Sequence, residues 1–127
     1  MGFSKRKSEC AKKKLKTYLS NSAAFTPTQK KARYWFNVIN TAAFKNKITF
    51  SNILVKNMRS NWGLCTHEGD LTEITVDAGI STRELFIATI AHEMVHLLQV
   101  QTKKSMNHSA YYLKWKRFFK KHYNITL

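Results

Sequence analysis

The sequence LFIATIAHEMVHLL occupies residues 85–98 and decides the fold of the chain. Its apolar residues follow one another with so few polar interruptions that a helix here must be buried on most of its faces. The preceding residues STRE (81–84) have the pattern of a capping box, with Ser81 as the N-cap residue. The pattern predicts a buried central helix that runs from Ser81 to about Val100.

Three side chains in this stretch can ionise, namely His92, Glu93 and His96. Burying a carboxylate and two imidazoles is costly unless the groups are paired or bind a metal. His92 and His96 share a helix face, so both imidazoles can bind one Zn²⁺ ion, while Glu93 points about 100° away and can act on a water molecule there. The spacing is the HExxH motif of zinc-dependent proteases. Two satisfied core histidines, with Glu93 in an ion pair, are the alternative that the residues leave open.

A third ligand must come from elsewhere in the chain, because a catalytic zinc ion keeps three protein ligands and one open position. His108 is the favoured candidate. It follows His96 by twelve residues, beyond a polar connection that can turn the chain back toward the metal. His67 and His122 compete with it, and each is otherwise explained as an exposed histidine.

The segments on either side of this helix predict an α+β domain. A helix is expected over residues 27–44, where a threonine and the only proline supply its start. From residue 48 to residue 76 the pattern changes to near-alternation with β-branched residues and a turn at 68–70, which predicts three short antiparallel strands. A last helix is expected over residues 109–123.

Residues 1–25 predict a basic amphipathic helix that precedes the rest of the domain. Ala11, Leu15, Tyr18 and Leu19 share one helix face, while the lysines between them point elsewhere. At 127 residues the chain is long enough for one core and one site. We therefore expect two N-terminal helices, a small three-stranded antiparallel sheet, the HExxH helix and a C-terminal helix that bears a ligand.

Together these residues resemble the SprT-like (Spartan-type) metallopeptidase domain. The resemblance rests on His92-Glu93-Met94-Val95-His96, on Asn107-His108, and on Trp62-Gly63-Leu64-Cys65 with Ser60 before it. It implies an α+β minimal zincin fold over residues 26–127 and a zinc protease that degrades proteins at DNA, including DNA–protein crosslinks. Ser109 stands where that family usually has glycine. The stretch 107–109 is also similar to the YgjP-like metal-dependent hydrolases.

Four residues near the motif are candidates for binding substrate. Trp62 and Gly63 could form the edge strand against which an extended peptide lies, since zincins bind substrate by adding a strand. Tyr111 or Tyr112 could place a phenol where it stabilises the oxyanion of the reaction. Packing in the core is the alternative explanation of the tryptophan and of both tyrosines.

The formal net charge of +15 is concentrated near the two ends of the chain. Seven Lys or Arg residues lie within residues 1–19 and seven within 103–122, whereas six of the seven acidic residues lie between Glu68 and Glu93. This pattern is typical of proteins that work near polyanions such as nucleic acids. A solubilising surface is the alternative. The residues expected to contact DNA without reading its sequence are Lys12, Lys13, Lys14, Lys16, Lys114, Lys116, Arg117, Lys120 and Lys121.

These expectations define a zinc metalloendopeptidase. His92, His96 and His108 would bind Zn²⁺, and Glu93 would act as general base on a protein or peptide substrate near DNA. The alternative is a basic DNA-binding or host-inhibitory module in which the zinc is structural and His67 closes the site as a fourth ligand.

The remaining sequence features concern the compartment. Cys10 and Cys65 form no CxxC pair and indicate a reducing environment. No apolar run approaches the length of a membrane span, and the basic N-terminus is not followed by the apolar region of a signal peptide. We expect a monomer inside the cell, in the cytoplasm or at the nucleoid, with no membrane partner.

Overall fold

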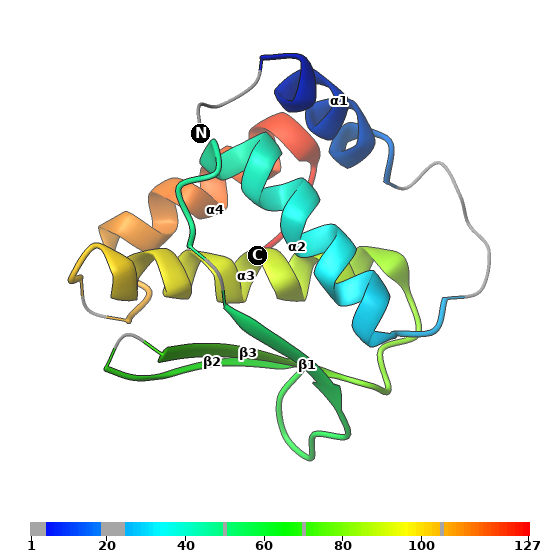
Figure 1. Ribbon diagram of the computed structural model, residues 1–127, viewed down its shortest axis with the longest axis vertical. Coiled ribbons are helices and arrows are strands. Elements are labelled where there is room, and N and C mark those ends of the chain that lie inside the picture. Colours follow the sequence, from blue (N-terminus) through cyan, green and yellow to red (C-terminus); the bar gives the residue numbers. More distant parts are fainter. Residues whose placement is uncertain (1–4, 19–24, 50, 70, 105) are drawn as a thin grey trace.

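The computed structural model describes residues 5–18, 25–49, 51–69, 71–104 and 106–127. Within these ranges the order of elements is α1 (Lys5–Lys16), α2 (Gln29–Phe44), β1 (Asn52–Lys56), β2 (Gly63–Glu68), β3 (Leu71–Asp77), α3 (Arg83–Gln101) and α4 (Ala110–Tyr123). The helices lie on one side of the sheet (Figure 1). The expected α+β class is confirmed. Leu19, which the sequence places on the first helix, lies outside the described residues.

Helix α3 is the centre of the fold, as its apolar sequence predicts. It runs across the inner face of the sheet and packs against α2 and α4 as well (Figure 1). The side chains of Phe86, Ile90, Met94 and Leu97 are completely buried. Burial on nearly every face explains why this helix shows almost no polar stripe.

The start of α3 differs from the expectation by one residue. Thr82, and not Ser81, is the N-cap, because its side chain accepts a hydrogen bond from the backbone N–H of Leu85 at 3.2 Å. Serine and threonine are both good N-cap residues. Two adjacent hydroxyls therefore leave the first turn ambiguous in the sequence.

The sheet is mixed, so the prediction of three antiparallel strands is wrong. Strands β2 and β3 form an antiparallel hairpin, but β1 runs parallel to β3, and the strand order is β1-β3-β2. The physical reason is burial. Ile74 and Val76 make β3 the most buried strand, so it takes the central position, whereas β2 has only Cys65 buried and stays at the edge.

Helix α1 packs on α2 through the apolar face that the sequence predicts. Ala11, Leu15 and Tyr18 are buried in the core, and the Tyr18 hydroxyl donates a hydrogen bond to the backbone oxygen of Asn124 at 3.1 Å. The N-terminal helix is thereby fastened to the segment that follows α4.

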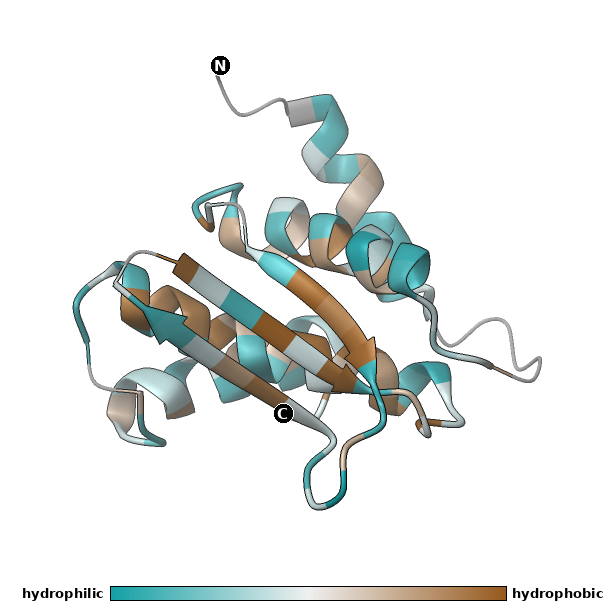
Figure 2. Ribbon diagram, turned by 60° about the horizontal axis from the view of Figure 1, so that its bottom comes forward, coloured by the Kyte–Doolittle hydropathy of each residue, from teal (hydrophilic) through white to brown (hydrophobic). Residues whose placement is uncertain are grey.

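The outer face of the sheet is open to solvent in the described structure. Figure 2 turns this face toward the reader, with the helices behind it. Leu64 on β2 is 44% exposed and Leu71 on β3 is 78% exposed. As for membranes, none of the described helices has the length and apolar character needed to cross one.

Candidate metal centre

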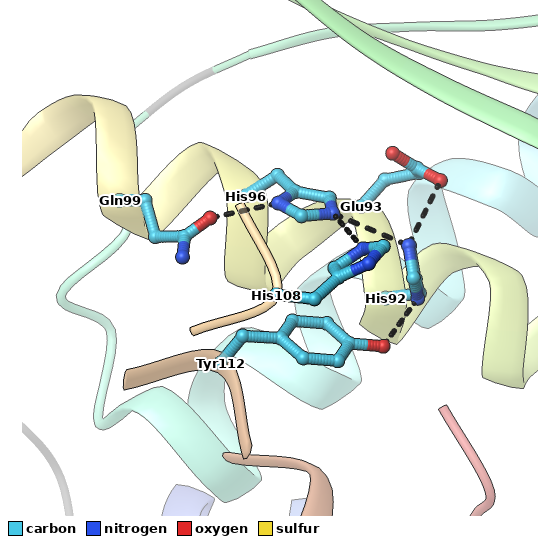
Figure 3. Close-up of polar contacts among 6 residues, drawn as sticks. All are labelled: His92, Glu93, His96, Gln99, His108 and Tyr112. Atoms are coloured by element: carbon cyan, nitrogen blue, oxygen red, sulfur yellow. Dashed lines mark hydrogen bonds and ion pairs between the residues drawn. The ribbon is translucent and has the colours of Figure 1, made fainter. Parts of the chain in front are cut away.

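Three histidines converge on one point beside the middle of α3 (Figure 3). His96 Nε2 lies 3.2 Å from His92 Nε2 and 3.3 Å from His108 Nε2, and the ligand atoms of all three residues lie within 4.8 Å of one another. A tetrahedral ion with metal–nitrogen bonds of about 2.0–2.1 Å holds its ligand nitrogens about 3.3–3.4 Å apart. The three imidazoles are therefore positioned to hold a metal ion.

The competing histidines lie elsewhere. His67 is on β2 and lines a pocket with residues at the C-terminal end of α3. The ring of His122 lies at a tilt against that of Phe118, with 4.7 Å between ring centroids. Among the residues that the structure describes, the metal-holding group consists of His92, His96 and His108. His108, which the sequence spacing favours, is therefore the third candidate ligand.

The second ring nitrogen of His96 is held by Gln99, which is completely buried. His96 Nδ1 lies 2.7 Å from Gln99 Oε1, and Gln99 Nε2 donates a hydrogen bond to the backbone oxygen of Asn107 at 3.0 Å. The second bond fixes the orientation of the amide, because only its nitrogen can donate to a carbonyl. Gln99 Oε1 must then accept from Nδ1–H of His96, which leaves Nε2 of His96 unprotonated for a metal.

Gln99 also explains how His108 reaches the centre. His92 and His96 are brought together by one turn of α3, but His108 belongs to the connection to α4. The hydrogen bond from Gln99 to Asn107 ties that connection to α3 one residue before His108. Sequence reasoning missed this residue. Its signal in the sequence was a polar side chain that follows two leucines, three positions after His96 on a mostly apolar helix.

We expect Gln99→Leu to weaken metal binding by about 10–100-fold, the usual cost of losing the hydrogen-bond partner of a histidine ligand. The variant removes both the acceptor for His96 and the tie to Asn107, while keeping an apolar side chain of similar size in the helix. Zinc affinity is measured by competition with a chromophoric chelator. Gln101→Leu, two residues away and bonded to Thr49, is the matched control. Equal affinities of Gln99→Leu and wild type would contradict the assignment.

Tyr112 holds His92 in a similar way. Its hydroxyl oxygen lies 2.7 Å from His92 Nδ1, and its ring stacks on that of His96 with an angle of 12° between the planes (Figure 3). The Tyr112 hydroxyl therefore contacts Nδ1 of His92, while Nε2 of His92 faces the other histidines. Tyr111 lies apart from these contacts, with Lys104 Nζ 5.0 Å from its ring centroid.

Glu93 is a buried carboxyl group next to the three imidazoles. It is 7% exposed, and its Oε2 lies 3.9 Å from His92 Nε2. Burial raises the pKa of Glu93 to about 7. Burial, followed by the charges of His96, His108 and Lys116, lowers the pKa of His92 to about 4, and burial also lowers the pKa of His96. Both histidines of the helix are thus neutral near pH 7, the form in which imidazole binds a metal.

Gly63 lets β2 lie directly on α3 at the motif. A Cβ at this position would be 2.5 Å from Cγ2 of Thr89 and 3.2 Å from both Cγ and Oε2 of Glu93. Only glycine permits so close an approach between strand and helix. Trp62, the residue before it, is 54% exposed. Both residues line a pocket that also contains His92 and Glu93.

Adding a methyl group at Gly63 should therefore disturb Glu93. We expect Gly63→Ala to destabilise the protein by about 1–3 kcal/mol, the range for overpacking a close contact, and to displace the carboxyl group. Thr89→Ser removes the methyl group that lies closest, so the double variant should recover part of the lost stability. Thermal unfolding of the two single variants and the double variant measures this coupling. If the change in stability of the double variant equals the sum of the two single changes, residues 63 and 89 are not coupled and the prediction is contradicted.

An α+β fold whose central helix carries two histidines and a buried carboxyl group, with a third histidine joining them, defines a candidate metal-binding domain. The SprT-like family profile matches residues 32–126. The chain therefore belongs to the SprT-like family. A search of curated proteins finds no match to the sequence.

Proposed function

We propose that the protein is a zinc-dependent endopeptidase. The observation that carries the proposal is the convergence of three imidazoles beside a buried carboxyl group. Imidazole nitrogens suit zinc, and the spacing of the ring nitrogens suits a tetrahedral ion. Three ligands among the described residues leave one tetrahedral position open, which is typical of catalytic rather than structural zinc sites.

Glu93 is the general base of the proposed reaction. A Zn²⁺ ion held by the three histidines would polarise the scissile carbonyl group and activate water. The carboxylate of Glu93 accepts the proton of the attacking water and delivers it to the leaving amine. A pKa of about 7 suits both steps near neutral pH.

The substrate is a polypeptide that lies along β2. This strand is at the edge of the described sheet and begins at Gly63, in contact with Glu93. An edge strand offers unpaired backbone groups to an extended peptide. Trp62 and Gly63 are therefore proposed to hold the peptide where it passes the metal centre.

The test of this function is hydrolysis of an unfolded protein by the zinc-loaded protein, with and without DNA. Fragments are separated by electrophoresis and identified by mass spectrometry. Loss of cleavage on adding a chelator, and its return on adding Zn²⁺, would support the proposal. A zinc-loaded protein that cleaves nothing would overturn it.

The proposed substrates are proteins associated with DNA. The basic residues of α1 and α4 named above are largely exposed, and the face of α4 that carries Lys116 borders the metal centre closely enough to lower the pKa of His92. A polyanion bound along α4 would thus lie beside the peptide site. These residues show no base-reading pattern, so binding is expected to depend on phosphates alone.

Charge reversal on α4 should weaken DNA binding in a way that identifies phosphate contacts. We expect Lys120→Glu with Lys121→Glu to flatten the dependence of log K on log salt, by about 0.9 per lost contact on duplex DNA and about 0.7 on single strands. Zinc content should not change. Lys56→Glu with Arg59→Glu makes the same change in net charge at exposed positions at the end of β1 and just after it, and is the matched control. If both pairs of substitutions weaken DNA binding equally, binding depends on the net charge of the protein and not on contacts made by α4.

A further inference from the structure

A small pocket adjoins Glu93 and His92, and its volume is about 260 Å³. Three segments that are far apart in the sequence form its other walls. These are the start of β2, the first half of α3 and the segment after α4, represented by Trp62, Gly63, Leu85, Ala88, Thr126 and Leu127. The pocket is smaller than the roughly 300–1,000 Å³ of sites for drug-sized ligands. Its size therefore suits a single amino-acid side chain.

The chemistry of the walls is unusual for this chain. The net charge is +15, yet no lysine or arginine is among the residues that line the pocket in the described structure. Leu85, Ala88 and Leu127 are apolar and pack against the core, while Glu93 is the one acidic residue in the lining. A negatively charged side chain would meet the carboxylate of Glu93, and no lysine or arginine in the lining would offset the repulsion. An apolar side chain would instead be removed from water.

The wall formed by the C-terminal segment is held firmly in place. Asn124 ends α4 with a left-handed conformation, at φ 56°, and turns the chain back toward α3. Ile125 is buried, and its N–H donates a hydrogen bond to the oxygen of Phe119 at 3.2 Å. Together with the bond from Tyr18 to Asn124, these contacts hold the chain two residues before Leu127, whose side chain itself packs against the core. A fixed wall can select by size.

We propose that this pocket receives an apolar side chain of the substrate residue next to the scissile bond, and that Ala88 and Leu127 set the size of side chain it accepts. The inference rests on the proposed peptidase function. Glu93 is both the general base and part of the wall, so a side chain in the pocket must belong to a residue beside the bond that breaks. The preferred substrates are thus polypeptides with leucine, isoleucine, methionine or phenylalanine at that position.

The experiment determines cleavage sites in reduced, unfolded casein by mass spectrometry. For the zinc-loaded wild type, these four residues should be enriched at one position flanking the cleaved bond, and acidic residues should be depleted there. Ala88→Leu fills the pocket and should lower cleavage at leucine and phenylalanine sites at least tenfold relative to alanine and serine sites. Leu127→Ala enlarges the pocket and should shift the preference toward phenylalanine and other aromatic residues.

Leu113→Ala makes the same substitution as Leu127→Ala at an exposed position on α4, and should keep the wild-type preference. Zinc content is measured for every variant. Unselective cleavage by the wild type, or a preference that neither Ala88→Leu nor Leu127→Ala alters, would overturn the pocket assignment and leave the peptidase function standing. A zinc-loaded wild type that hydrolyses nothing would overturn both.

Discussion

Replacing Glu93 by glutamine is expected to remove nearly all hydrolysis while the fold and the metal remain. Glutamine has almost the same size as glutamate, but its amide cannot accept the proton of the attacking water. Loss of a general base typically lowers the rate by about 10²–10⁴-fold. Initial rates of cleavage, measured at equal zinc content, give the size of the effect.

Glu84→Gln is the matched control for this substitution. It makes the same chemical change on the same helix, in the first turn of α3, where the side chain is exposed. This variant should cleave at the wild-type rate. If Glu93→Gln also turned over substrate at the wild-type rate, Glu93 would have no part in the mechanism.

His96→Ala should have the largest effect on the metal itself. His96 is the histidine whose Nε2 lies within 3.3 Å of both of the others, so its loss leaves two imidazoles that are held less closely. We expect the bound zinc to fall from one ion per chain to a small fraction after dialysis, a greater loss than the roughly 10–100-fold effect of removing a ligand's hydrogen-bond partner. Elemental analysis of the dialysed protein measures it.

The same measurement tests the third ligand. His92→Ala and His108→Ala should also lose zinc, whereas His67→Ala and His122→Ala should keep one ion per chain. Stoichiometric zinc at wild-type affinity in His108→Ala would show that a different residue completes the site. A loss in His67→Ala would favour a closed, structural site instead.

The sequence predicts local features of this fold well, because they depend on neighbouring residues. The period of apolar residues determines where α3 lies, and a four-residue spacing is enough to bring His92 and His96 to one face. The position of His108 at the metal centre depends less on neighbouring residues, because it requires the connection from α3 to α4 to turn back toward α3. A polar connection of suitable length indicated that turn, and the structure confirms where it leads.

Features that depend on competition between distant segments were not predicted. Strand patterns show which residues face a core, but they do not show that β3 is inserted between β1 and β2. The role of Gln99 depends on where Asn107 lies in space, eight residues away, and no local pattern contains that information.

The open edge of β2 has a consequence for solubility. An exposed edge with Leu64 beside it is a template on which a second copy of the chain could pair and begin to aggregate. At low ionic strength, copies of the chain that each carry a net charge of +15 repel one another. The edge of β2 therefore stays unpaired and free to receive a peptide. Salt screens that repulsion, and a bound polyanion cancels it. The charge that would recruit the protein to nucleic acid therefore also protects it from self-association in solution, and it does so only while the protein is unbound.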